Sequence, residues 1–393
     1  MSIIRMDIEP TVLEDAIRKS GRSFDEVKQR FTSFDKWINK ELSPTYNQLV
    51  DLSKYLRVPF GYLLIKTPIV ETLPLLEFRT IDTESIAKPS RELVDTIYDM
   101  EIKQDWLRNK LIEEGIEPLP YVGMFDANTD INYKVIVEEI RRTFSLSKDW
   151  YKSATSRITT FNLLRDKLSQ HGIIIMQNGI ALNNTHRKLD INEFRAFTLV
   201  DEYAPLIFIN TLDSNNGKTF SLLHEVAHIF LGVDSLYNDV YQQTEKYVNT
   251  MEVLCNKIAG ELIAPTDIFI NLWKSVDAEE QGLNEKITEI SEHFKVSKLV
   301  IARKALDQKY INAKQYAEIA HNVKVEFSMS RNIKRRPGGD AVNNARSRLD
   351  DNCMRTLVAS TEYGETSYSE AYRLAGISRG VFEDVAERLK EVR

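Results

Sequence analysis

Two histidines lie four positions apart in an apolar stretch, His224 and His228, and Glu225 directly follows the first. At about 100° per residue, positions i and i+4 share one face of a helix, so both imidazoles would point at one metal ion. Glu225 would lie about a quarter-turn away, where it reaches a water beside that ion without displacing it. The alternative is a pair of core histidines hydrogen-bonded inside a buried helix. Because two histidines and a carboxylate are costly to bury unless something binds them, the pattern favours a zinc-peptidase helix that ends at Gly232.

A catalytic zinc site needs a third protein ligand and one open position for water. One class of zinc peptidase places a glycine three residues and a histidine six residues after the second histidine, but Leu231 and Asp234 occupy these positions. An acid on the next helix is the alternative. Glu252 lies on a largely apolar stripe with Cys255 and Ala259, where a charge needs a partner. We therefore predict Glu252 as the third ligand and expect Cys255 to pack beside the site. Three other acids are expected to be solvated in the polar connection: Asp234, Asp239 and Glu245.

The composition is that of an ordinary globular protein, with 42% hydrophobic and 28% charged residues in a chain of 393. This length is enough for two or three domains with their own cores. The sequence has no run of 18 apolar residues and no signal segment at its start, so we expect no membrane span and a cytoplasmic protein. Cys255 and Cys353 are the two cysteines, which suits a reducing compartment and excludes a disulfide scaffold. The net charge of -6 argues against a protein that coats nucleic acid.

The predicted fold is α+β and mostly helical, with a small β-sheet. We divide the chain into a helical bundle at 1–68, a linker and long bracing helix at 69–130, a domain that carries the metal helix at 131–328, and a basic linker with a helical module at 329–393.

The first 68 residues are predicted to form short helices joined by brief turns. Gly21 closes the first helix, Ser23 and Glu26 have the spacing of a capping box, and further helices cover 33–39 and the residues after Pro44. Such a pattern fits a helix-turn-helix unit. The presumed recognition helix at 34–40 contains an acid and few base-reading groups, so weak DNA binding is expected. A protein-docking or dimerising bundle is the alternative.

The remaining helices and strands are predicted from the spacing of the hydrophobic residues and from the residues that cap helices. Pro68 and Pro74 interrupt helix in the linker, and a long helix covers 90–114. Further helices are expected at 133–144, 159–170, 249–263, 285–294 and 297–307, and strands at 173–176, 194–200 and 206–209. The basic segment 330–348 is predicted to be a solvated linker. Ser367 and Glu370 form a capping-box pattern that opens a helix, and Gly376 turns the chain into a second one.

The motif around the metal helix resembles the ImmA/IrrE family of metallopeptidases, in the long form with an N-terminal XRE-type helix-turn-helix domain. The segment from Glu252 through Cys255 and Ala259 to Pro265 matches the family's pattern of an acid, a small residue, an apolar-alanine pair and a proline. The approach to the metal helix at 197–214 is also similar to the family, and less specific similarities occur at 58–64, at 76–80 and in the tail at Gly338 and Glu370. The similarity covers nearly the whole chain, and it departs from the family most in the third N-terminal helix.

This resemblance implies a zincin-like metallopeptidase domain at 131–328 and an XRE-like helix-turn-helix domain at 1–68. It also implies a cytoplasmic zinc endopeptidase whose targets are proteins, often helix-turn-helix repressors, and relatives also act as the partner of a toxin from a neighbouring gene. In the predicted mechanism, Zn²⁺ binds His224, His228 and Glu252 and lowers the pKa of its water to about 7, and Glu225 takes the proton. An edge strand at 194–200 would hold the peptide by β-addition. Three candidates remain for the group that stabilises the oxyanion: Tyr203, Tyr241 and His293.

A second hypothesis comes from a different class of protein. The chain could be an XRE-type regulator or antitoxin that acts by binding a partner protein or DNA, with a structural or vestigial metal site. The presence of Glu225 favours the protease, because a structural site needs no general base.

Overall fold

The computed structural model describes residues 4–69, 89–126, 132–237, 250–276, 282–331 and 340–391. The chain divides into two compact units, Met1–Pro74 with Ala87–Asp95, and Leu75–Ile86 with Thr96–Arg393. Several residues singled out in the sequence lie outside the described ranges: Asp239, Tyr241, Glu245, Gly338 and the segment 76–80. No helix of the described ranges is both long enough and apolar enough to cross a membrane.

Short helices form the first unit, as the caps predict. Ser23 and Glu26 exchange both hydrogen bonds of a capping box, and Thr45 does the same with Gln48. Gly21 ends the first helix with a left-handed φ of 69°. The core of the unit is built around Trp37, which is 1% exposed. The elements are α1 (Pro10–Ser20), α2 (Phe24–Arg30), α3 (Phe34–Ile38), α4 (Tyr46–Leu56) and the 3₁₀ helix η1 (Phe60–Leu64).

The second unit contains a four-stranded mixed sheet with the order β1-β3-β2-β4. Its strands are β1 (Ile174–Asn178), β2 (Ala196–Leu199), β3 (Leu206–Asn210) and β4 (Ser235–Tyr237). β1 runs parallel to β3, and the other two pairs are antiparallel. The three predicted strands are confirmed. The prediction of an edge strand at 194–200 is wrong, because β2 hydrogen-bonds to β3 on one side and to β4 on the other.

One face of the sheet packs against a large helical core. Ile175, Ile207 and Ile209 share this core with the buried side of α9 (Asn215–Leu231). The surrounding helices are α7 (Tyr133–Thr143), α8 (Arg157–Ser169), α10 (Thr250–Ile263), α11 (Thr266–Ser275), α13 (Leu283–Phe294), α14 (Lys298–Asp307) and α15 (Ala313–Arg331), with the 3₁₀ helix η2 (Trp150–Ser153). The helices predicted between residues 133 and 307 are confirmed, with bounds that shift by one or two residues. The overall class, mostly helical with a small mixed sheet, is therefore α+β as predicted.

The other face of the sheet packs against α6 (Arg91–Glu113). The buried Gln104 side chain donates to the carbonyl oxygens of Leu199, at 2.8 Å, and Ala204, at 2.9 Å. These bonds tie α6 to the end of β2 and to the turn that follows it. The predicted long helix is confirmed. Its expected role in bracing the first unit stays a prediction.

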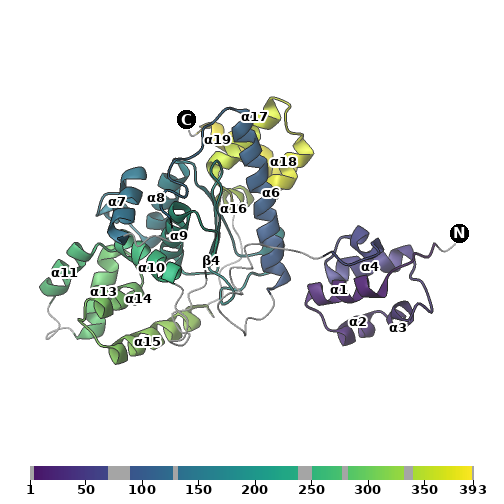
Figure 1. Ribbon diagram of the computed structural model, residues 1–393, viewed down its shortest axis with the longest axis horizontal. Coiled ribbons are helices and arrows are strands. Elements are labelled where there is room, and N and C mark those ends of the chain that lie inside the picture. The colour runs from purple at the N-terminus through teal and green to yellow at the C-terminus, as the bar shows by residue number, and fades with distance from the viewer. Residues whose placement is uncertain are drawn as a thin grey trace. The chain divides into compact units, whose positions relative to one another are not determined.

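The C-terminal helices close the β1 edge of the sheet and lie beside α6 (Figure 1). The Asp350 carboxylate accepts from the backbone N–H of Ile175 at 3.2 Å, and the Arg165 guanidinium donates to the Ile175 carbonyl at 3.1 Å. The prediction of a solvated linker at 330–348 is wrong for its last part, because α16 packs against β1 and buries Val342. These helices are α16 (Ala341–Arg348), α17 (Asp351–Glu362), α18 (Tyr368–Ala375) and α19 (Arg379–Glu391).

Candidate metal centre

Both ends of the metal helix α9 are held by neighbouring segments. At its start the Ser214 hydroxyl accepts from the Gly217 backbone at 3.0 Å, and a Cβ at Gly217 would lie 2.3 Å from an oxygen of Asp213. At its end Gly232 has a left-handed φ of 67°, and a Cβ there would lie 2.9 Å from the Cα of Gly123. The Gly123 backbone N–H in turn donates to the Ile229 carbonyl at 2.9 Å. At both positions a side chain would collide with a neighbouring segment, so glycine is required there. These neighbouring segments hold both ends of α9 in place.

The helix that carries Glu252 is held in a similar way. Arg141 is buried and donates to the carbonyl oxygens of Glu261, at 3.0 Å, and Leu262, at 3.2 Å, and the Trp150 indole donates to the second of these at 3.1 Å. These bonds satisfy carbonyl groups that a helix end leaves without intrahelical partners. Because α10 packs directly on α9, this anchoring also holds α10 in place against α9.

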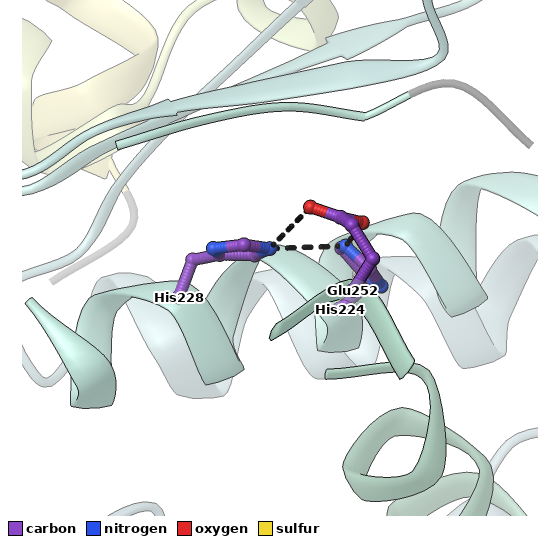
Figure 2. Close-up of side chains that lie close together, drawn as sticks. All are labelled: His224, His228 and Glu252. Atoms are coloured by element: carbon purple, nitrogen blue, oxygen red, sulfur yellow. Dashed lines mark hydrogen bonds and ion pairs between the residues drawn. The ribbon is translucent and has the colours of Figure 1, made fainter. Parts of the chain in front are cut away.

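His224, His228 and Glu252 come together between these two helices. Their ligand atoms all lie within 4.8 Å of one another. The Glu252 carboxylate lies 3.1 Å from His224 Nε2 and 3.4 Å from His228 Nε2, and the two Nε2 atoms are 3.2 Å apart. Figure 2 shows the two rings and the carboxylate pointing toward one shared position. Both histidines are buried, whereas the Glu252 side chain is 37% exposed and opens the cluster to solvent.

The charges of the cluster are strongly coupled. Burial alone would raise the pKa of Glu252, but the neighbouring His224 and His228 rings lower it well below its ordinary value. Burial would lower the pKa of His228, yet Cys255 and Glu252 beside it raise that pKa well above its usual range. Burial also raises the pKa of the Cys255 thiol, so it stays neutral. An ionised carboxylate and two imidazoles at such distances are the donor set that zinc prefers.

A further side chain orients the first histidine. Asn256 Oδ1 lies 3.0 Å from His224 Nδ1. Since an amide oxygen only accepts, this bond places the proton on Nδ1 and leaves the Nε2 lone pair for a metal. Asn256 lies four residues after Glu252 and therefore on the same face of α10.

Glu225 is fully buried, and its two oxygens have different surroundings. Oε2 accepts from the Thr198 hydroxyl at 2.5 Å and from the Ser235 hydroxyl at 2.8 Å, whereas Oε1 has no hydrogen-bond partner. Thr198 of β2 and Ser235 of β4 are directly paired across the two strands. Burial raises the pKa of Glu225. A carboxylate whose one oxygen is anchored and whose other oxygen is free has the arrangement that a general base needs.

The other candidates from the sequence lie elsewhere. Asp234 is half-buried rather than solvated, because its carboxylate accepts from the Val200 backbone at 2.6 Å and so joins the start of β4 to the end of β2. His293 packs against Tyr151 and Phe294, and neither it nor Tyr203 has a described contact with the cluster. No oxyanion donor is therefore assigned among the described residues.

Thr198, Ser235 and Asn256 were not identified from the sequence. Asn256 could have been, because its spacing from Glu252 places both on one face of a helix. No local sequence pattern identifies Thr198 or Ser235, because they reach Glu225 through the pairing of two strands that are far apart in the chain.

Comparison with known families agrees with this geometry. Residues 168–306 match the IrrE N-terminal-like domain, Peptidase_M78. This match includes both helices of the cluster, supports the ImmA/IrrE family and points to a metallopeptidase. Residues 350–388, which hold most of the C-terminal helices, match a domain of unknown function, DUF8813. No curated protein and no solved structure matches the chain.

Proposed function

We propose that the chain is a zinc-dependent endopeptidase that cleaves a protein substrate. The observation that carries the proposal is the buried Glu225 carboxylate, which has one free oxygen and lies on the helix that also carries His224 and His228. The donor set fits zinc, since two imidazole nitrogens and one carboxylate converge within 4.8 Å and leave one side open through the exposed part of Glu252. A purely structural site has no use for an unpaired carboxylate beside it.

Each residue has a separate role in this mechanism. His224, His228 and Glu252 would hold the zinc ion, and Asn256 keeps the first histidine in the required tautomer. Zinc in such a site supplies Lewis-acid chemistry, by favouring ionisation of water and polarising a carbonyl. Glu225 Oε1 accepts the proton of the attacking water and then delivers it to the leaving amine. Thr198 and Ser235 hold Oε2 so that Oε1 keeps its direction.

The sheet suggests where an extended substrate would lie. Asp350 and Arg165 occupy the backbone groups of Ile175 on the outer side of β1, so that edge offers no place for a further strand. β4 is the other edge strand, and it packs on α9 beside the cluster. A peptide that added to β4 would pass next to Glu225 with its main-chain hydrogen bonds satisfied, which supports an unfolded or flexible segment of a protein as substrate.

The first unit supports a protein rather than DNA as the partner. Its helix order fits a helix-turn-helix unit, with α3 as the recognition helix, but α3 has only five residues. Two exposed lysines of the first unit, both outside α3, are paired with acids, Lys28 with Asp35 at 2.9 Å and Lys40 with Glu9 at 2.8 Å. Such ion pairs lower the positive charge with which the unit could bind the phosphates of DNA. We propose that this unit recruits the substrate, a helix-turn-helix repressor or a toxin encoded by a neighbouring gene.

The Glu225→Gln variant tests the proposal. The change replaces one oxygen by nitrogen, so the zinc-binding residues should still hold about one zinc per chain while the rate of cleavage falls by roughly 10²–10⁴. Proteins captured by this variant in cells that express it are identified, and the intact mass of each is measured after incubation with wild-type or variant protein. Glu318→Gln, at an exposed glutamate of α15, is the matched control and should cleave normally.

The alternative, a regulator that acts only by binding, has a distinct outcome in the same experiment. If Glu225→Gln and wild type leave every captured partner uncut and produce the same cellular phenotype, the chain acts as a binding protein. The endopeptidase proposal would then be wrong.

A further inference from the structure

The last three helices, α17, α18 and α19, form a C-terminal module beside α6 (Figure 1). α18 is followed by a turn of three residues, 376–378, and then by α19. Gly376 begins this turn with a left-handed φ of 65°. Two helices joined by a short turn that contains glycine form a helix-turn-helix unit, in which the second helix contacts the partner. α19 therefore occupies the position of a recognition helix.

One side of α19 packs into the module, and the opposite side is exposed. Three apolar residues at helical spacing are buried: Phe382, Val385 and Leu389. The ring of Phe382 lies 5.3 Å from that of Tyr372 in α18, and this contact fixes the two helices against each other. Three acids are exposed on the other side: Glu383, Asp384 and Glu387. Residues three and four apart are neighbours on a helix, so these acids form one continuous face.

The negative charge of this face is only partly balanced. Each cation of α19 is already paired with a carboxylate: Arg379 with Glu383 at 2.7 Å, Arg388 with Asp340 at 3.2 Å and Lys390 with Glu362 at 2.5 Å. In the part of the chain that the structure describes, no cation lies within ion-pair distance of Asp384 or Glu387. Phosphates would be repelled by these two acids and would find no unpaired cation on α19. The helix is therefore unsuited to DNA.

Two exposed tyrosines border the second half of α19. Tyr363 is 82% exposed and Tyr368 is 53% exposed. Tyr363 directly follows Glu362, which is paired with Lys390. The Glu362 carboxylate, and to a smaller extent Glu387 and Tyr368, raise the pKa of Lys390, so these groups surround one ammonium. Tyrosine is enriched at protein interfaces, and the face of its ring attracts lysine and arginine.

The spacing of the two unpaired acids indicates the form of a partner. Asp384 and Glu387 lie three residues apart, so their side chains begin about 5–6 Å from each other. Lysines or arginines three or four residues apart on another helix have the same separation. Alternate side chains of an extended segment begin about 6.6 Å apart, which fits the two acids less well.

We propose that α19 and the two tyrosines bind a basic helix of a partner protein. Its lysines or arginines would pair with Asp384 and Glu387 and lie against the rings of Tyr363 and Tyr368. Helices of this kind are the ones that DNA-binding proteins present to phosphates. The docking surface is separate from the histidine cluster, so it does not depend on cleavage. Residues 350–388 match a domain with no assigned function, and this surface would give that domain one.

The probe is a labelled helical peptide of 16 residues, rich in alanine, with a lysine at every fourth position. Its binding to the full chain is followed by fluorescence anisotropy, beside a peptide in which glutamate replaces each lysine. We expect saturable binding of the lysine peptide alone. The double variant Asp384→Asn, Glu387→Gln should weaken it roughly fivefold or more. Tyr363→Ser and Tyr368→Ser should each weaken it roughly two- to fivefold.

A second pair of acids provides the matched control. Glu285 and Glu289 are exposed and lie one turn apart on α13, so Glu285→Gln with Glu289→Gln removes the same charge elsewhere. This variant should bind the lysine peptide as wild type does. An equal loss in both double variants would show that only the overall negative charge attracts the peptide. Absence of saturable binding, or equal binding of the glutamate peptide, would also refute the proposal.

A duplex of 20 base pairs, titrated at physiological salt, tests the other class of partner. We expect Arg379→Gln, in which the cation at the start of α19 is lost, to leave any binding of the duplex unchanged. If this variant weakens the binding of DNA, α19 contacts nucleic acid and the proposal of a basic protein partner is wrong.

Discussion

The two hydroxyls on Glu225 allow a quantitative test of the catalytic arrangement. Replacing Thr198 by valine keeps the shape of the side chain and removes the hydroxyl that donates to Glu225 Oε2 at 2.5 Å. A hydrogen bond to a charged group contributes about 1.5–3 kcal/mol. Both groups are fully buried, so no solvent molecule replaces the lost donor. If that energy is needed to hold Oε1 in position, the rate falls by about 10–150-fold, at 1.36 kcal/mol for each factor of ten.

The assay is kcat and KM for cleavage of the partner that the Glu225→Gln protein captures. We expect Thr198→Val to lower kcat with little change in KM and no loss of zinc, because the hydroxyl that is lost donates to Glu225 and not to a residue that would hold zinc. Ser235→Ala removes the second donor, at 2.8 Å, and should act in the same direction. Thr198→Ser retains a hydroxyl and should recover most of the activity.

Two comparisons would refute this reasoning. Thr160 is also buried, at 1% exposure, and donates to the Ser156 carbonyl at 2.8 Å, so Thr160→Val is a matched loss of one buried hydroxyl away from the cluster. If Thr160→Val lowers kcat as much as Thr198→Val, the effect is general destabilisation. In a double-mutant cycle, Thr198→Val should add nothing to Glu225→Gln. Additive losses would show that Thr198 acts through some other group.

Three other predictions follow from the same packing. Asn256→Ala should weaken zinc binding by about 10–100-fold in a chelator competition, because His224 loses the partner that selects its tautomer, and Asn256→Asp should retain most of the affinity. Residues 1–68 alone should bind DNA weakly and without sequence preference, and tight binding to one duplex at physiological salt would contradict this. Burial would raise the pKa of Glu261, but the Lys304 ammonium and Thr266 lower it, so its ionised form stabilises the fold. Glu261→Gln should therefore lower the free energy of unfolding by about 2 kcal/mol at neutral pH, and the difference from wild type, measured in urea, should shrink as the pH falls below about 4.

Helix positions were largely predictable because their signals are local. The capping boxes at Ser23 and Thr45 and the glycine at position 21 act within a few residues of themselves, so their outcome does not depend on the rest of the chain. The basic segment before the C-terminal helices shows where this approach fails. Its charge pattern suggests a linker, yet Val342 and Ala345 are buried in α16. The surface that covers them comes from elements outside the segment.

The sheet shows the same limit more clearly. An apolar run predicts that β2 is a strand, but it does not predict which strands lie on either side of it. β4 has only three residues and no strong strand pattern, and its pairing with β2 turns the expected edge strand into an internal one. This pairing moves the proposed substrate edge from β2 to β4.

The sequence by itself determined the spacing of His224, Glu225 and His228 and the placement of Glu252 on an apolar helical stripe, because both follow from the period of an α-helix. Only the tertiary structure decided that these side chains converge within 4.8 Å, since this depends on how α9 packs against α10. It also decided which oxygen of Glu225 is free, because the two hydroxyls that hold the other oxygen come from strands 37 residues apart (235 − 198). Local periodicity sets the face of a helix on which a residue lies, whereas contacts between distant segments determine what that face meets.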